Sequence, residues 1–116
     1  MSITRYQPGP RMSQAVRHGN TVYLAGQVAD DEFATIEVQT QQVLAKIDAL
    51  LAEAGTSKDK VLSVQVLLNN IADFAAMNSA YDQWVDKTNP PARATFEARL
   101  ASPNLRVEIV VVAAVE

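Results

Sequence analysis

The stretch from Leu105 to Val115 carries hydrophobic side chains on both faces of a predicted β-strand. Successive side chains of a strand point to opposite sides of its sheet. One row reads Leu105, Val107, Ile109, Val111, Ala113 and Val115, and the other reads Arg106, Glu108, Val110, Val112 and Ala114. From Ile109 onward both rows are apolar, so this strand needs a cover on each side of the sheet.

The first part of the chain predicts a hairpin followed by a long helix. Two short strand patterns, Ala15–His18 and Thr21–Ala25, flank Gly19 and Asn20, a pair that tolerates the backbone of a tight turn. Apolar residues then recur at three- and four-residue steps from Ile36 to Ala54, which is typical of an amphipathic helix.

The second part of the chain predicts strand, helix, strand and strand. Alternation indicates a strand over Val61–Leu68, and a helix follows from Asn70 until Asn89-Pro90-Pro91 prevents its continuation. In Ala92–Arg99 we expect Ala92, Ala94, Phe96 and Ala98 to face the core, with Arg93 on the other face. A hairpin between the last two strands, turning around residues 101–104, would then place Arg93 and Glu108 on one face without direct contact.

These elements give the order ββαβαββ in a single domain spanning residues 1–116. We therefore predict an α+β fold, a mixed β-sheet with two helices packed on one face. The other face would expose Val61, Leu67, Val110, Val112 and Ala114 to water. Monomers seldom expose such a patch, so self-association, commonly as a closed ring, is expected.

Composition and motifs exclude several classes of function. The net charge of −3 and the absence of a basic cluster argue against a nucleic-acid partner. No cysteine is present, and His18 is the only histidine, so neither a metal site nor a catalytic triad is indicated. Phosphate-binding glycine motifs are absent, so we expect no cofactor. The N-terminal residues lack a secretory signal and no apolar run could span a bilayer, so we expect no membrane partner and a cytoplasmic location.

Four positions are candidates for chemistry on the residues alone. Arg93 follows two prolines and has small neighbours, so its guanidinium has room to bind a carboxylate in bidentate fashion, although a surface salt bridge is the commoner role. Glu108 lies beside valines and could handle protons, or pair with an arginine. Asn78 lies on the apolar side of its helix and needs a hydrogen-bond partner, of which a backbone group is the expected one. Gly26 permits a close approach of a ligand to the backbone, or makes a plain turn.

Five short blocks together resemble the Rid family, the reactive intermediate deaminases. They are Ser13-Gln14-Ala15-Val16, Gly19 to Gln27, Asp73 to Asn78, Pro91-Ala92-Arg93 and Val107-Glu108-Ile109, and they span nearly the whole chain in family order. The resemblance implies a chorismate mutase-like fold, a homotrimer and ligand clefts between subunits. It also implies hydrolysis of 2-aminoacrylate, 2-iminopropionate and similar enamines or imines to 2-keto acids and ammonia, without metal or cofactor.

The resemblance also assigns roles to residues. Arg93 matches the arginine that holds the substrate carboxylate, and Glu108 matches the glutamate that positions the attacking water. Asn78 and Gly26 match positions that line the cleft. Two positions depart from the pattern, because Met12 stands where many members have tyrosine and Thr95 where many have cysteine.

Two other functions remain compatible with the sequence. A noncatalytic trimer could bind a carboxylate metabolite in the same cleft as a sensor or scaffold; Met12 favours this alternative, and retention of Arg93 and Glu108 favours the deaminase. A mutase resembling chorismate mutase would use the same architecture, but the blocks around Gly26 and Arg93 fit the deaminases better.

Overall fold

The computed structural model describes residues 1–116. The segments with alternating hydrophobic residues form one β-sheet, and the segments with a helical repeat form two α-helices. The predicted order is confirmed, with two further short strands, β1 and β4, and two 3₁₀ turns. The elements are β1 (Ile3–Tyr6), β2 (Ala15–His18), β3 (Thr21–Leu24), β4 (Gln27–Val28), α1 (Ile36–Glu53), η1 (Lys58–Lys60), β5 (Val61–Leu68), η2 (Ile71–Asp73), α2 (Phe74–Trp84), β6 (Ala92–Glu97) and β7 (Val107–Ala114).

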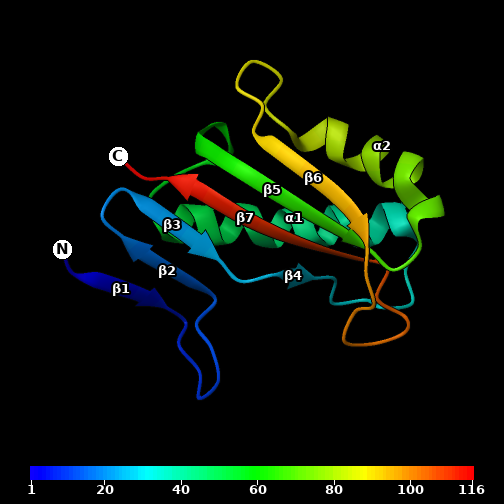
Figure 1. Ribbon diagram of the computed structural model, residues 1–116, viewed down its shortest axis with the longest axis horizontal. Helices are drawn as coiled ribbons and strands as arrows, with labels where there is room; N and C mark the ends of the chain where they lie inside the picture. Colours follow the sequence, from blue (N-terminus) through cyan, green and yellow to red (C-terminus); the bar gives the residue numbers. More distant parts are fainter.

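The last strand lies inside the sheet, as its two apolar faces require. The strand order is β1-β2-β3-β7-β5-β6, and β4 also pairs with β7. β7 runs antiparallel to β3, β4 and β5, whereas β5 and β6 are parallel. Figure 1 shows β7 between β3 and β5, with β1 and β6 at the two ends of the sheet.

The predicted hairpin between the last two strands is wrong. β6 pairs with β5, with Val64 opposite Arg93 and Leu67 opposite Phe96, and it does not pair with β7. The physical reason is the connection through α2, because a strand–helix–strand crossover returns the chain parallel to its first strand. The other edge of β5 is then left for β7, which places Leu67 opposite Glu108.

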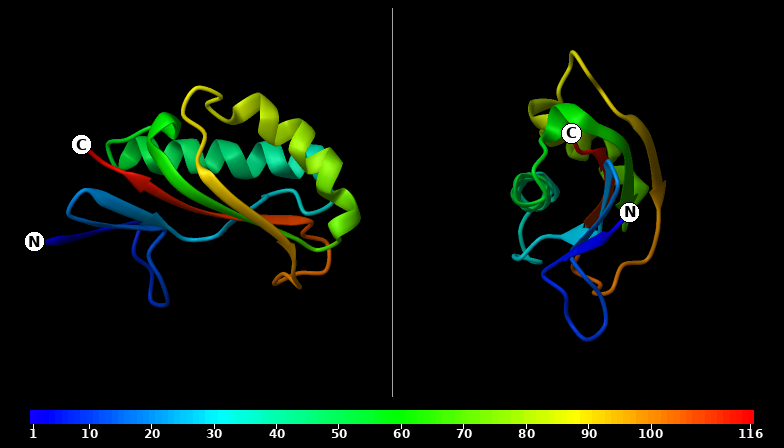
Figure 2. Two further views of the ribbon diagram at one scale, coloured as in Figure 1. Left: turned by 45° about the horizontal axis from the view of Figure 1, so that its top comes forward. Right: turned by 90° about the vertical axis from the view of Figure 1, so that its left-hand side faces the viewer.

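Both helices cover the same face of the sheet, as predicted (Figure 2). The inward row of β7 packs there and is fully buried, together with Val64 and Val66 of β5. α1 adds Val43, Ile47 and Leu51 to the same core. One cluster of 23 buried hydrophobic residues results.

A β-bulge in β5 changes which side chains face outward. The register shifts between Val61 and Ser63, and an extra residue in one strand turns the side chains before it to the opposite face. Val61 is therefore buried at 5% exposure, whereas Leu62 is 52% exposed. The expectation that Val61 lies on the open face is therefore wrong, because Val61 is in the core and Leu62 is the exposed residue.

The face without helices is apolar, as expected, and β6 contributes to it. Leu67, Val110, Val112 and Ala114 are only half-buried there. Phe96 is 44% exposed, so the prediction that it faces the core is wrong. Its register with Leu67 places it on the open face because laterally paired residues share a side. No helix in the structure has the length and apolar character needed to cross a membrane.

Candidate functional site

Arg93 lies on the helix face of the sheet, contrary to the prediction that it occupies the non-core face. It is in register with Val64, which is itself opposite the buried Val111. Because β6 is an edge strand, an arginine on this face reaches the side of α2 while remaining exposed. The side chain therefore meets α2 rather than the open face.

Three side chains of α2 hold the guanidinium of Arg93. Asn78 Oδ1 accepts a hydrogen bond from Arg93 Nη1 at 2.7 Å. The guanidinium carbon lies 4.7 Å from the ring centre of Tyr81 and 5.9 Å from that of Phe74. Positions 74, 78 and 81 lie on one helix face because they are four and three residues apart. The predicted backbone partner of Asn78 is thus replaced by the side chain of Arg93.

This arrangement orients Arg93 without consuming its capacity to bind an anion. Cation–π contact and one hydrogen bond fix the plane of the guanidinium, and its other N–H donors remain available for a bidentate carboxylate. Burial raises the pKa of the Tyr81 hydroxyl, an effect that the nearby positive charge of Arg93 opposes. Tyr81 therefore stays neutral at physiological pH.

The hydroxyl of Thr95 adds a second polar group beside Arg93. Thr95 is two residues further along β6 and shares its face. Its Oγ1 is shielded from solvent and has no hydrogen-bond partner in the chain. Buried hydroxyls normally find a partner, but neither water nor a ligand reaches this oxygen in the present conformation.

A second group forms around Glu108 on the open face. Glu108 is half-buried, is in register with Val28 of β4, and its side chain closely approaches Gly26. A Cβ added at Gly26 would lie 2.1 Å from Glu108 Oε2, so the absence of a side chain at Gly26 makes room for the carboxylate.

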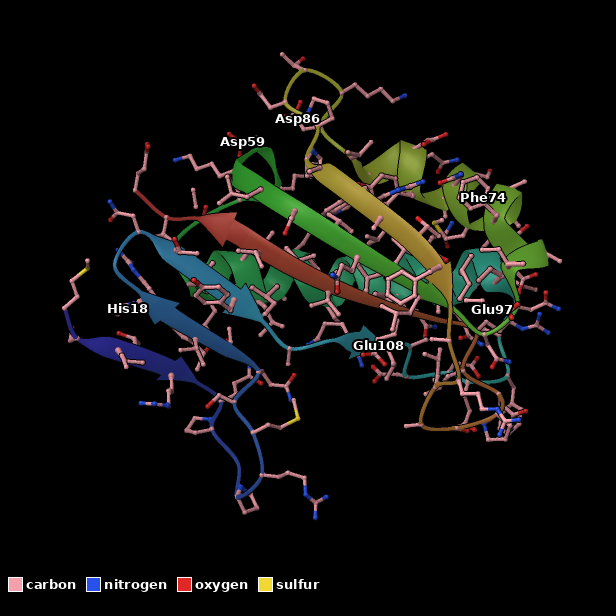
Figure 3. The ribbon with its side chains drawn as sticks, in the orientation of Figure 1. His18, Asp59, Phe74, Asp86, Glu97 and Glu108 are labelled. Carbon is pink, nitrogen blue, oxygen red and sulfur yellow. The ribbon has the colours of Figure 1, made fainter.

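The two groups do not meet within one chain. Arg93 and Asn78 lie on the helix face at the β6 edge, whereas Glu108 and Gly26 lie on the open face near β4. In the view of Figure 3, β5 and β6 lie between Glu108 and Phe74 of α2. The prediction that Arg93 and Glu108 share a face is therefore wrong, and the two halves of the candidate site lie apart within one chain.

Met12 and His18 take no part in the contacts described above, and two residues beside Arg93 were not predicted. Met12 is 49% exposed in the loop between β1 and β2. His18 is exposed at the β2–β3 turn, far from Phe74 and Glu108 (Figure 3). Nowhere do three His, Asp or Glu side chains gather to hold a metal ion. Phe74 and Tyr81, which the sequence placed with the hydrophobic face of the helix, were missed as neighbours of Arg93; their spacing around Asn78 was the available signal.

Comparison with known proteins identifies the family. The sequence pattern described as Endoribonuclease L-PSP matches residues 3–115. The chain belongs to this family. It is 45% identical to a RutC family protein of Haemophilus influenzae over 97% of this chain and 98% of the relative. It is also 42% identical to the RutC family protein YoaB of Escherichia coli, over 99% of this chain and all of that protein.

Solved structures of the family share the whole fold. A YjgF family member from Neisseria meningitidis, 41% identical, superimposes with a TM-score of 0.97 over 100% of this chain and 97% of its own. A Rid family protein from Yersinia pestis, 33% identical, gives a TM-score of 0.83 over 93% of this chain and 90% of its own. The expected Rid family membership is thus confirmed, together with the fold class.

Proposed function

We propose that this chain hydrolyses small 2-imino acids and their enamine tautomers, such as 2-iminopropionate and 2-aminoacrylate, to 2-keto acids and ammonia. The observation that carries the proposal is the pose of Arg93. Asn78 and Tyr81 hold its guanidinium while leaving donors free for a carboxylate. Family membership supports a deaminase-type role for the same residues.

The proposed reaction needs only modest catalysis because the imine carbon is already electrophilic. Arg93 holds the substrate carboxylate, which fixes the position of the adjacent C=N carbon. Glu108 accepts a proton as water adds to that carbon and returns it to the departing nitrogen. Water supplies the keto oxygen, the C–N bond breaks, and ammonia leaves.

The two half-sites support an active site between subunits of a homotrimer. Because Arg93 and Glu108 lie on opposite faces of one sheet, a substrate that meets both needs a second chain. We propose that the β6 edge and α2 of one subunit meet the Gly26–Glu108 region of the next. Contact between the open apolar faces would also cover Leu62, Phe96 and Val110.

The deciding experiment measures hydrolysis of 2-iminopropionate that an amino-acid oxidase generates in place. Wild type should accelerate keto-acid formation, Arg93→Ala should lose nearly all of the acceleration, and Arg93→Lys should recover only a part because lysine lacks the planar fork. A wild-type rate equal to that of buffer would refute the proposal.

A noncatalytic trimer that binds a carboxylate metabolite is the second candidate, and Met12 favours it. A thioether at this exposed position supplies no hydroxyl for proton transfer. In that case 2-ketobutyrate would bind in an Arg93-dependent manner while imine hydrolysis stays at the buffer rate. Cleavage of RNA, which the family's description names, has little support from a chain of net charge −3 with one exposed histidine.

A further inference from the structure

A pocket separate from the candidate site lies on the helix face, between α1 and the segments that precede and follow the β2–β3 hairpin. Its volume is about 330 Å³, and its lining consists of Gln7, Gln14, Gln27, Lys46, Ala49 and Leu50. This volume is at the lower end of ordinary ligand pockets, roughly 300–1,000 Å³. Three side-chain amides, one ammonium group and a small apolar wall therefore face one space.

Gln27 provides a buried acceptor with no partner in the protein. The residue is 6% exposed. Its Nε2 donates to Gln14 Oε1 at 3.0 Å and to the carbonyl oxygen of Ala25 at 2.9 Å. The carbonyl of Ala25 can only accept, which fixes the orientation of the amide. Gln27 Oε1 accepts no hydrogen bond within the chain and is not sealed off, so it is left for an occupant of the pocket.

Lys46 and Gln14 provide donors at the same pocket. Lys46 Nζ donates to the carbonyl oxygen of Val28 at 2.8 Å and pairs with Asp30 at 2.7 Å. An ammonium group has one more donor than these contacts use. Asp30 is 85% exposed, so the pairing is largely screened by solvent. The Nε2 of Gln14 makes no hydrogen bond in the chain, because only its Oε1 is engaged, with Gln27.

Gln7 provides a second acceptor at the rim. Its Nε2 donates to Glu53 Oε1 at 2.7 Å, which turns its own Oε1 away from that carboxylate. The pocket therefore offers two donor groups, on Lys46 and Gln14, and two amide oxygens, on Gln27 and Gln7. Ala49 and Leu50 of α1 form the apolar wall.

We propose that this pocket binds a free α-amino acid with an aliphatic side chain. The carboxylate meets Lys46 and Gln14, the ammonium meets the amide oxygens of Gln27 and Gln7, and the side chain lies along Ala49 and Leu50. The zwitterion matches this set of groups because it carries acceptors and donors on one carbon. The site does not depend on the proposed imine hydrolysis.

The pocket is separate from both halves of the candidate site. Gln27 is in register with the buried Ile109, so its side chain lies on the helix face, whereas Glu108 lies on the open face. Arg93 is at the far end of the sheet, beyond β7 and β5. Because Gln27 directly follows Gly26, an occupant would tie α1 to the backbone that adjoins Glu108.

The test is titration of the full ¹⁵N-labelled chain with L-leucine, followed by NMR. We expect saturable shifts of the side-chain amide signals of Gln14 and Gln27 and of the backbone around Lys46. Lys46→Met should weaken binding about tenfold through loss of a charge-assisted hydrogen bond. The matched change Lys58→Met, at an exposed lysine outside this pocket, should leave the affinity unchanged.

Two ligand probes keep the test decisive if Lys46→Met does not fold. N-acetyl-L-leucine lacks the ammonium and L-leucinamide lacks the carboxylate, so both should bind more weakly than L-leucine. Arg93→Ala should bind L-leucine as wild type does. No saturable shift with millimolar L-leucine, or shifts only near Asn78 that vanish in Arg93→Ala, would overturn the proposal.

Discussion

Arg93 owes its pose to a helix rather than to its own strand. The amide oxygen of Asn78, which accepts a hydrogen bond from Arg93, and the rings of Tyr81 and Phe74 lie on one face of α2. An exposed arginine without such contacts would sample many rotamers and lose that entropy on binding a ligand. Preorganisation by α2 therefore reduces the cost of holding a carboxylate.

Substitutions of Asn78 separate the effect of the orientation of Arg93 from the effect of its charge. Asn78→Ala removes the acceptor of a hydrogen bond from a charged donor, a loss of about 1.5–3 kcal/mol, so kcat/KM for 2-iminopropionate should fall roughly ten- to a hundredfold. Asn78→Asp should be more harmful, because its carboxylate would pair with Arg93 and compete with the substrate. Steady-state kinetics of the two variants tests this order, and wild-type activity in Asn78→Asp would contradict it.

A similar prediction concerns the contact between Gly26 and Glu108 on the open face. Gly26→Ala would place a methyl group 2.1 Å from the present position of Glu108 Oε2, so the carboxylate must move. We expect a folded protein with most of its imine hydrolysis lost. Gly9→Ala is the matched control, because its added Cβ would lie 3.5 Å from the nearest heavy atom, an ordinary contact. Equal loss in both variants, or none in Gly26→Ala, would count against this role of Gly26.

Among the elements, the loop between α2 and β6 determines where Arg93 enters the sheet. Asp86 Oδ1 accepts backbone hydrogen bonds from Thr88 at 2.9 Å and from Asn89 at 3.2 Å. These bonds hold the pKa of the Asp86 carboxyl below its usual value of 3.8. The charged form of Asp86 thus stabilises the turn that leads to Pro90 and Pro91.

This turn predicts a pH-dependent effect on stability. Because the folded pKa is lowered, the contribution of Asp86 is present above pH 3.8 and is lost as the pH falls through the folded value. Asp86→Ala should therefore lower the melting temperature at neutral pH, and the difference from wild type should disappear in acid. Asp82→Ala, an exposed change without these bonds, is the control. A difference that persists in acid would exclude the carboxylate as its cause.

Local patterns predicted the helices and the main strands, because each is encoded by the period of its own residues. The pairing of the strands was harder to predict from the sequence. The placement of β6 beside β5 follows from the α2 crossover, but the sequence interpretation joined β6 to β7 by proximity along the chain. Arg93 was placed on the wrong face for another reason, because the row of alanines and Phe96 was assigned to the core, whereas in this edge strand that row lies on the open face. The bulge at Leu62 had no local signal, because Val61 and Leu62 are both apolar and either could face the core.

The open apolar face of the sheet predicts self-association of the chain. Val110→Asp would place a carboxylate among apolar side chains that a neighbouring subunit would cover in the proposed trimer, which is costly. Sedimentation should show a trimer for wild type and a smaller mass for Val110→Asp. Val38→Asp in the first turn of α1, where an acid suits the helix N-terminus, should keep the wild-type mass. A monomeric wild type would contradict the proposed assembly.

The separation of Arg93 from Glu108 makes the strongest prediction about assembly. Arg93→Ala and Glu108→Gln should each be inactive alone. If each active site takes Arg93 from one subunit and Glu108 from the next, every mixed trimer regains one intact site. Random reassembly of equal amounts makes three quarters of the trimers mixed, so about one quarter of wild-type activity should return. Denaturing and refolding the two variants together, with each variant refolded alone as the control, measures this recovery. A mixture as inactive as its components would contradict an active site that takes Arg93 from one subunit and Glu108 from the next.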